Sequence, residues 1–379
     1  MSEVKRNFIC GFVPPYVLEA IAGSASVPEE SRIACRYTLT HASTYADQRH
    51  ELCTHAHAPA QAQQTEQQTL KPAGGELVAV QRKIYDCKQT ANRPGTLARS
   101  EGQVRGKDRQ VNNCYDGFKI THDFFYKAFG RKSLDNQGMP LVASVHFNPA
   151  SEPNGYNNAF WDGNKNQMVF GDGDHIAFDY LTDSLDVIAH ELSHGFVQYS
   201  SPLMYYWQSG ALNESCADIF GSMVEQWHMR QTADEADWIL GQTLFPVSFT
   251  GAALRSLKAG KAYTNDPVLG TDPQPKHMRD IYTEDRDLKG VHINSGIPNH
   301  AFYLAAKRLG GYSWEKAGKV WYKTMLSGRI PWECKFAEFA AVTVEVAEQE
   351  FPNDASVKDA IRDAWDKVGV VIGSATASL

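Results

Sequence analysis

The chain has 379 residues, and 37 lysines and arginines stand against 44 aspartates and glutamates, giving a formal charge of -7. Hydrophobic residues make up 42% and charged residues 21%, which is typical of a globular protein. The length suggests two or three domains. A mildly acidic chain is not expected to bind nucleic acid or an anionic membrane. No apolar run approaches the roughly 20 residues that a membrane-spanning helix needs.

The N-terminal residues do not have the pattern of a secretory signal. A signal peptide has an uninterrupted apolar region after its basic residues, whereas here Pro14 and Pro15 interrupt the stretch that follows two early basic residues. We therefore expect synthesis in the cytoplasm without a signal peptide, and secretion by a leaderless route stays open. Seven scattered cysteines with no Cys-x-x-Cys pair argue against a dense disulfide framework and a cysteine-rich zinc module.

Composition and pattern divide the chain into three parts. Residues 1–34 form a short ordered segment, whereas residues 40–75 are rich in Gln, Ala, His and Thr and predict a flexible linker. Strand patterns follow at 76–87, 139–147 and 166–174, with a helix at 113–129. Helical patterns then cover 184–199, 211–227, 298–309, 313–326, 335–349 and 356–368. We predict an N-terminal segment and linker (1–75), a β-rich lobe (76–200) and a mainly helical lobe (201–379).

The helix predicted at 184–199 carries the pattern His-Glu-x-x-His. On a helix, residues four apart share one face, so the imidazoles of His190 and His194 could hold one zinc ion. Glu191 would then lie beside a water on the metal. The pattern alone is not proof, because five residues of this kind also occur by chance.

A second helix adds a carboxylate at the expected place. Glu214 follows His194 by 20 residues and would complete a His, His, Glu zinc set with one open position. Asp218, one turn further, could accept the second ring N–H of a ligand histidine. The alternative is that both carboxylates lie on a solvated face. Asp287 and His292 form a further acid–imidazole pair, although a lone histidine is more often structural.

These motifs make the chain resemble the thermolysin family of zinc metallopeptidases. The segments FGRKSLDNQGMPLVASVHF, YNNAFWDG, MVFGDGD, DVIAHELSHGF, SGALNESCADIFGSMVE, ALRS and GVHINSGIPNHAFYLA occur in the family's order and cover roughly residue 81 to the C-terminus. FICGFVPPYVLEAIA is similar to the protealysin-like branch, which has short N-terminal propeptides. The resemblance implies an α+β, thermolysin-like two-lobed fold with the His-Glu-x-x-His helix between the lobes.

The resemblance also implies an activity. The chain would be a zinc-dependent endopeptidase, made as a self-processing zymogen, that cuts peptide bonds before bulky apolar residues through Glu-assisted attack of zinc-bound water. Its partners would be protein or peptide substrates and its own propeptide as inhibitor, with no nucleic acid and no membrane, and we expect a monomer. A relative that binds zinc or peptides without turnover, and an unrelated zinc hydrolase, remain the alternatives.

Roles can be carried over residue by residue from the resemblance. The implied zinc ligands and the groups that act on the reacting bond are His190, His194 and Glu214 for zinc, Glu191 as general base, Tyr205 and His292 for the oxyanion, Asp287 to orient His292, and Asp218 to support a zinc ligand. The implied substrate contacts are Asn158 and Ala159 for the extended peptide, Arg255 for a carbonyl, and Val187 and Leu254 for the pocket after the cut.

The calcium cluster of the family is matched only in part. Asp186, Glu225 and, with a shift in spacing, Asp237 match its carboxylates. Fewer charged oxygens weaken a site for a hard cation, so we expect one weak calcium ion or none. The alternative is that the three residues are surface charge.

The resemblance suggests how the first residues keep the precursor inactive. We hypothesise that residues 8–21 lie over the cleft and block substrate. The thiolate of Cys10 could approach the zinc, although an ordinary free thiol is the more economical interpretation.

Overall fold

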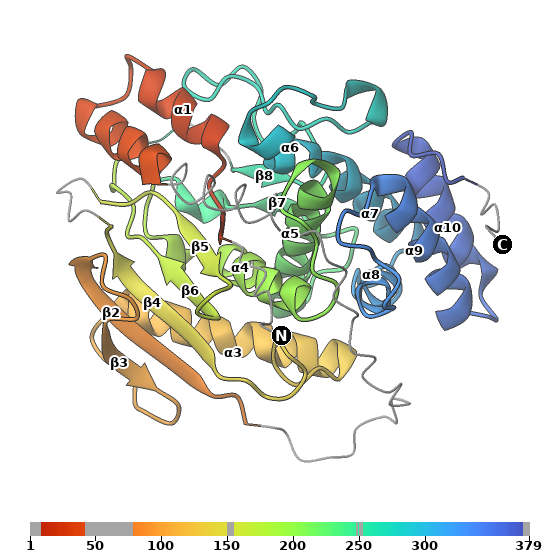
Figure 1. Cartoon of the computed structure of the whole chain (residues 1–379), viewed down its shortest axis with the longest axis horizontal. Coiled ribbons are helices and arrows are strands. Elements are labelled where there is room, and N and C mark those ends of the chain that lie inside the picture. The colour runs from red at the N-terminus through yellow and green to blue at the C-terminus, as the bar shows by residue number, and fades with distance from the viewer. Residues whose placement is uncertain (1–8, 42–78, 150–154, 248, 250–252, 374–379) are drawn as a thin grey trace, which may run out of the picture.

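The computed structural model describes residues 9–41, 79–149, 155–247, 249 and 253–373, and these form a β-rich part and a helical part that meet at two central helices. Figure 1 shows α4 and α5 in the middle of the molecule, between the sheet and the C-terminal helices. This arrangement confirms the predicted α+β fold. The domain boundaries at 75 and 200 remain a prediction.

The main sheet has six strands in the order β1-β5-β6-β4-β2-β3. The pairs β2–β4 and β4–β6 are parallel, and the other three pairs are antiparallel. A separate pair, β7–β8, is antiparallel. The strands are β1 (Ile9–Gly11), β2 (Arg82–Thr90), β3 (Thr96–Ser100), β4 (Leu141–Phe147), β5 (Ala159–Asp162), β6 (Gln167–Phe170), β7 (Ile239–Leu240) and β8 (Arg255–Ser256).

The helices match the predicted patterns most closely in the C-terminal half. They are α1 (Pro15–Gly23), α3 (Arg109–Phe129), α4 (Leu185–Gln198), α5 (Trp207–Met229), α6 (Asp287–Asn294), α7 (Gly296–Leu309), α8 (Ala317–Met325), α9 (Phe336–Glu350) and α10 (Ala355–Lys367). A further helix covers residues 29–41, which the sequence pattern did not predict.

Helix α3 begins four residues earlier than its apolar pattern predicts. The side chain of Asp108 accepts hydrogen bonds from the backbone N–H groups of Gln110 and Val111, so it caps the first turn. The helix ends at Gly130, whose φ of 70° is the left-handed conformation that glycine adopts without strain. The cap explains the early start, because Asp108 satisfies donors that would otherwise be unpaired.

Two glycines allow the central helices to approach one another. A Cβ atom added to Gly221 on α5 would lie 2.9 Å from the carbonyl oxygen of Asp186 on α4, and one added to Gly117 on α3 would lie 2.7 Å from Ile188 Cδ1. Real side chains essentially never make such contacts. Helix α4, which carries the predicted zinc ligands, is therefore held closely by α3 and α5.

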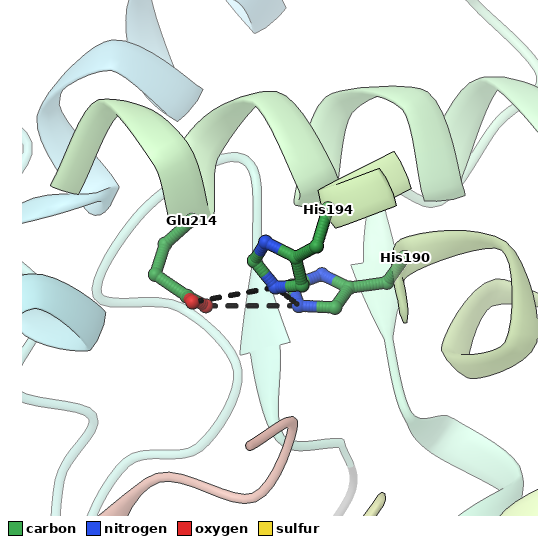
Figure 2. A group of neighbouring side chains, drawn as sticks. All are labelled: His190, His194 and Glu214. Atoms are coloured by element: carbon green, nitrogen blue, oxygen red, sulfur yellow. Dashed lines mark hydrogen bonds and ion pairs between the residues drawn. The ribbon is translucent and has the colours of Figure 1, made fainter. Parts of the chain in front are cut away.

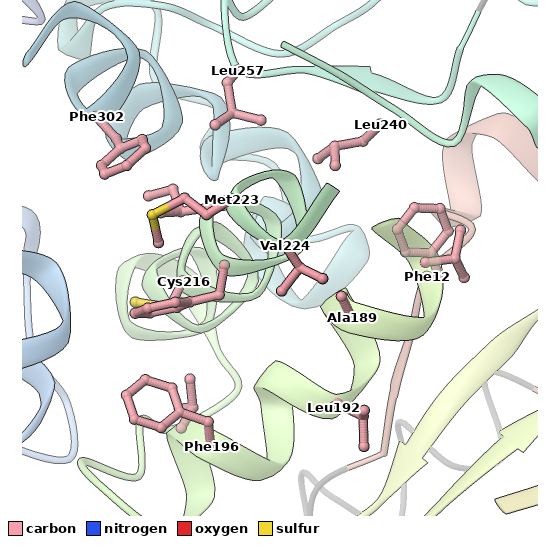
Figure 3. Close-up of a cluster of buried hydrophobic side chains, with 14 of the residues drawn as sticks. Phe12, Ala189, Leu192, Phe196, Cys216, Met223, Val224, Leu240, Leu257 and Phe302 are labelled. Carbon is pink, nitrogen blue, oxygen red and sulfur yellow. The ribbon is translucent and has the colours of Figure 1, made fainter. Parts of the chain in front are cut away.

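Residues 9–41, called here the N-terminal segment, pack onto the rest of the molecule. Strand β1 forms one edge of the main sheet beside β5, and Val17, Leu18 and Ile21 of α1 are buried in the large core. Figure 3 shows Phe12 at the edge of the cluster of apolar side chains around α4 and α5. The predicted linker at 40–75 lies almost wholly outside the described residues.

Candidate active site

Three buried side chains from α4 and α5 converge on one point. His190 Nε2 and His194 Nε2 are 3.0 Å apart, and Glu214 oxygens lie 3.6 Å and 3.4 Å from them. Figure 2 shows the two rings and the carboxylate facing one another from the two helices. Within the described ranges these three form the one group of three or more His, Cys, Asp or Glu side chains that could hold a metal ion.

The other ring nitrogen of each histidine faces an oxygen. His190 Nδ1 lies 2.8 Å from Asp218 Oδ1, and His194 Nδ1 lies 2.9 Å from Asn213 Oδ1. These contacts favour a proton on each Nδ1, which leaves each Nε2 lone pair free for a metal. Burial lowers the pKa of His194 to about 4, so its ring is neutral at pH 7. The three side chains therefore offer the two ring nitrogens and the carboxylate oxygen that a zinc site requires.

Glu191 lies next to this group without being part of it. Its side chain is fully buried, and neither carboxylate oxygen makes a hydrogen bond of good geometry. Burial is the main cause, and the nearby Glu214 carboxylate the second, that raises the pKa of Glu191 well above its usual value. The backbone N–H groups of Trp161 and Phe12 offset this rise only in part.

Tyr205, His292 and Asp287 form a chain of contacts that begins at Glu214. Tyr205 donates its hydroxyl hydrogen to Glu214 and lies 3.2 Å from His292 Nε2. Asp287 Oδ1 is 2.6 Å from His292 Nδ1, and Asp287 Oδ2 accepts the backbone N–H of His292 at 2.9 Å. Burial alone would lower the pKa of His292, but Asp287 and Glu214 outweigh it and raise the pKa to about 9.

Arg255 on β8 contacts Asp218 and the N-terminal segment at the same time. Its guanidinium donates to both oxygens of Asp218, at 2.9 to 3.2 Å, and to the carbonyl oxygen of Phe12 at 2.7 Å. Asn299 donates to Asp218 at 2.9 Å. Burial would raise the pKa of Asp218, but Arg255 and His190 outweigh it and hold the pKa well below its usual range. Asp218 is therefore an anion shared between a histidine of the metal group and Arg255.

The N-terminal segment runs through the site in an extended conformation. The carbonyl oxygen of Gly11 lies 3.0 Å from His292 Nε2, and Phe12 donates its N–H to the carbonyl of Ala159 at 3.0 Å. Asn158 accepts the N–H of Val13 at 2.9 Å and donates to its carbonyl at 3.2 Å. The residues predicted to hold a substrate backbone thus all contact this strand.

The side chain of Phe12 is fully buried beside the metal group. Its ring lies 4.9 Å from the ring of His190, and the Arg255 guanidinium lies 4.5 Å from it. Leu254 and Phe12 both approach Gly241, where an added Cβ would lie 3.1 and 3.2 Å from them. Val187 is buried on α4 in the same core cluster. The structure therefore places Leu254 close to Phe12, whereas a place for Val187 in the pocket after the cut stays a prediction.

Asp186, Glu225 and Asp237, the residues matched to calcium, are not among the described groups whose ligand atoms lie close enough together to hold a metal ion. Asp186 accepts the hydroxyl hydrogen of Ser184 and the N–H groups of Val187 at 2.7 Å and Gly241 at 2.6 Å. Asp237 Oδ1 accepts the N–H of Ile239 at 3.0 Å. Burial, together with Asp186 and Asp237, raises the pKa of Glu225 to about 8, so this carboxyl is largely neutral at pH 7. Protein donors bind both oxygens of Asp186 and one oxygen of Asp237, and calcium binding by the three residues stays a prediction.

Sequence reasoning missed several residues of the site. Asn213 and Asn299 contact His194 and Asp218, and Gln274 donates to the carbonyl of His292 at 2.8 Å. Asn213 directly precedes Glu214, and its amide was a signal that could have been used. The position of residues 11–13 supports the hypothesis that the segment 8–21 lies over the cleft, although residue 8 is outside the described residues. The hypothesis that Cys10 approaches the zinc falls outside the described part of the structure, because it rests on the side chain of Cys10.

Comparisons with known proteins agree with this geometry. The family description "Thermolysin metallopeptidase, catalytic domain" matches residues 40–198, and "Thermolysin metallopeptidase, alpha-helical domain" matches residues 201–370. An "Extracellular metalloprotease" of Pectobacterium carotovorum is 42% identical over 97% of this chain and 99% of its own length. "Protease PrtS" of Photorhabdus is 41% identical over 98% of this chain and 94% of its own.

A solved structure is similar over nearly the whole chain. It is the "Precursor of Protealysin, Metalloproteinase from Serratia proteamaculans", with 42% identity, a TM-score of 0.80, and coverage of 96% of this chain and 100% of that one. The N-terminal residues are thus included in the likeness, which supports the protealysin-like branch.

The comparisons also correct one expectation. The cytoplasmic location inferred from the N-terminal pattern is wrong, because the Pectobacterium relative, which matches over almost its full length, is named an extracellular protease. A weak signal-peptide pattern argues against one export route only, so it did not justify a cytoplasmic location. Among the described residues, no helix combines the length and apolar character needed to cross a membrane.

The matched families, the full-length relatives and the buried His, His, Glu group together establish that the chain belongs to the thermolysin family of metallopeptidases, as a protealysin-like zinc metalloendopeptidase.

Proposed function

We propose that this chain is a secreted endopeptidase that cuts peptide bonds preceding bulky apolar residues and that its N-terminal segment inhibits it until it is removed. The observation that carries this proposal is the position of residues 11–13. A peptide backbone lies across the metal group with its carbonyl and amide groups bonded to the residues that a substrate would need. Secretion is proposed from the name of the Pectobacterium relative.

His190, His194 and Glu214 would hold the zinc ion. Zinc, when bound, polarises a carbonyl group and lowers the pKa of a water molecule. Glu191 is placed to take a proton from the attacking water and to deliver one to the leaving amine. Calcium has no role in the proposal, because the oxygens of Asp186 are bonded to protein donors.

Tyr205 and His292 would stabilise the negative charge that develops on the substrate carbonyl. The contact between His292 Nε2 and the Gly11 carbonyl oxygen supports this role, since that oxygen occupies the place of the scissile carbonyl. Asp287 holds the His292 ring through its Nδ1 atom, which keeps Nε2 directed at the peptide. Donors fixed in advance of the reaction in this way are worth roughly 3–4 kcal/mol each.

The substrate backbone would be held on the side that follows the cut. Asn158 and the carbonyl of Ala159 bind the extended strand, and Arg255 binds the carbonyl after the cut, as they bind Val13 and Phe12 here. The Gly11–Phe12 bond lies where a substrate bond would be cut, so the ring of Phe12 marks the pocket for the residue after the cut. A large apolar side chain fits that pocket beside Leu254.

The test compares the wild-type protein with Glu191→Ala, using casein and a peptide library as substrates. Glu333→Ala, which changes an exposed glutamate, is the matched control. We expect zinc to bind all three proteins, and cleavage to be lost only in Glu191→Ala. Equal cleavage by wild type and Glu191→Ala would reject the catalytic assignment. A library preference for charged residues after the cut would reject the pocket assignment alone.

A further inference from the structure

The turn that carries Asp287 has an uncommon backbone conformation. Asp287, Leu288, Lys289 and Gly290 are four consecutive residues whose φ angles lie between 49° and 75°. Glycine adopts this left-handed conformation without strain, but the other three residues do not. The turn can therefore persist only because contacts around it hold it in place.

A second strained residue stands on the facing helix. Trp207, the first residue of α5, has a φ of 46°. Tyr205 precedes Trp207 by two positions, and His292 follows Gly290 by two positions. Helix α6 lies beside α5 (Figure 1). Each of the two residues proposed to stabilise the substrate oxygen is thus attached to a strained segment, and strain of this kind is most often found at functional sites.

The side chain of Lys289 joins the two strained segments. Its Nζ atom lies 5.0 Å from the centre of the Trp207 ring and 6.0 Å from the centre of the Tyr206 ring. An ammonium group at this distance is attracted to the face of an aromatic ring. The neighbouring residue of the turn adds an apolar contact, because Leu288 packs against a small cluster that includes Tyr205, Val291 and Trp332.

The backbone of the turn is held from its other side. Asn294 Nδ2 donates to the carbonyl oxygen of Lys289 at 3.2 Å and to that of Tyr282 at 2.9 Å. The N–H of Gly290 donates to the carbonyl oxygen of Arg286 at 2.8 Å. A Cβ atom on Gly290 would lie 2.6 Å from Tyr282 Cδ1, so the turn is closely packed there. These contacts fix the turn to its own surroundings, and none of them reaches α5.

We propose that Lys289 is a positioning residue for peptide hydrolysis. Its ammonium group, held against two aromatic rings, keeps Tyr205 and His292 at the spacing at which both reach the substrate carbonyl. The Tyr205 hydroxyl oxygen lies 3.2 Å from His292 Nε2, and a small displacement of either group lowers the rate steeply. The inference rests on the oxyanion role proposed above for these two residues.

The experiment measures kcat and KM on a peptide substrate with zinc-loaded protein expressed as the full chain. The amount of processed enzyme is determined on a gel, so that kcat refers to processed molecules. The test variant is Lys289→Gln, which removes the charge and keeps much of the length, and Lys289→Arg keeps the cation as the rescue variant. The matched control is Lys127→Gln, because Lys127 Nζ lies 5.4 Å from the ring centre of Trp227 near the other end of α5. Tyr205→Phe is measured alone and combined with Lys289→Gln.

Lys289→Gln should lower kcat by about 3–10-fold and leave KM unchanged, because contacts to the oxyanion act in the transition state. Lys289→Arg should stay within about 2-fold of the wild type, and Lys127→Gln should match it. In the Tyr205→Phe protein, Lys289→Gln should cost less than in the wild type, because residues that act through one another are not additive.

Two results would overturn the inference while leaving the oxyanion role intact. One is a Lys289→Gln protein with the kcat of the wild type while Tyr205→Phe loses activity. The other is a Lys289→Gln protein whose KM rises while its kcat is unchanged, which would place Lys289 in substrate binding. Full activity of Tyr205→Phe would instead reject the oxyanion assignment itself, and this inference with it.

Discussion

Asp218 and Arg255 form an ion pair in which neither side chain is exposed, with 2.9 Å between the closest atoms. The pair joins two parts of the site, because Asp218 also contacts His190 and Arg255 also binds the Phe12 carbonyl. A buried anion shared in this way fixes a metal-ligand ring and a substrate-binding cation with one group. Substitution of either partner should therefore affect both parts.

Asp218→Asn should weaken zinc binding and destabilise the protein. The neutral amide is a poorer acceptor for His190 Nδ1, and loss of such an outer contact typically costs about 10–100-fold in metal affinity. It also leaves the Arg255 guanidinium buried without a counter-charge, at a cost of about 3–5 kcal/mol. Zinc affinity is measured by competition with a chromophoric chelator, and stability by urea unfolding. Asp363→Asn, in an exposed pair with Lys367, is the control. Equal zinc affinity in both variants would contradict the role given to Asp218.

Gly221→Ala should disturb the zinc helix without changing any polar group. The added methyl would lie 2.9 Å from the Asp186 carbonyl oxygen and 3.3 Å from the Cα of His190, so α4 and α5 must separate. Overpacking of this kind typically costs about 1–3 kcal/mol. We expect lower stability by urea unfolding and a lower kcat on a peptide substrate. Gly106→Ala, which meets nothing within 4 Å, should change neither quantity. A Gly221→Ala protein with unchanged kcat would show that the close helix contact does not position His190.

The parts of the site that the sequence could predict are those set by local geometry. His190 and His194 are four residues apart on one helix, and Glu214 lies on the next helix, so a pattern with short spacing suffices to propose them. The helix at 113–129 was found from its apolar face, but its start at Arg109 depends on the cap by Asp108. A cap is a hydrogen bond of one side chain, and an apolar periodicity does not report it.

Contacts between distant segments could not be predicted in the same way. Gly11 and His292 are 281 positions apart, and Ser31 and Asp174 are 143 apart, so no local pattern relates them. The helix at 29–41 was missed because its buried face consists of Ser, Ala, Cys and Thr, which carry little apolar signal. Asp174 binds the N-terminal helix and Asp172 binds His146, and the MVFGDGD segment that contains both residues has no local pattern that predicts these contacts.

Calcium should leave the stability of the zinc-loaded protein unchanged. A cation at Asp186 would have to displace the N–H groups of Val187 and Gly241, and Glu225 with its pKa raised to about 8 would have to lose a proton. The melting temperature is compared in excess calcium and in a calcium-selective chelator, with free zinc buffered at one value. A rise in melting temperature with calcium that Asp186→Asn abolishes would contradict this prediction. Removal of zinc by a stronger chelator is the positive control, and it should abolish cleavage.

His146 should make the protein less stable at alkaline pH. Its ring lies between two carboxylates, with Nδ1 2.8 Å from Asp172 Oδ2 and Nε2 2.9 Å from Asp108 Oδ2. Burial alone would lower the pKa of His146, but Asp172 and Asp108 outweigh it and raise the pKa from 6.5 to about 9. The folded protein therefore holds the proton more tightly than the unfolded chain. This contribution is complete below pH 6.5 and is lost as the pH rises through 9.

The rise of the His146 pKa from 6.5 to about 9 corresponds to roughly 2–4 kcal/mol of stability. Urea unfolding of the Glu191→Ala protein at pH 7 and pH 10 measures it without self-digestion. His146→Asn is the test variant, because residue 146 has a φ of 54° that asparagine tolerates. The wild-type free energy of unfolding should fall by roughly this amount more than that of His146→Asn between the two pH values. If both proteins lose the same stability, the carboxylates of Asp108 and Asp172 do not hold His146 in its charged form.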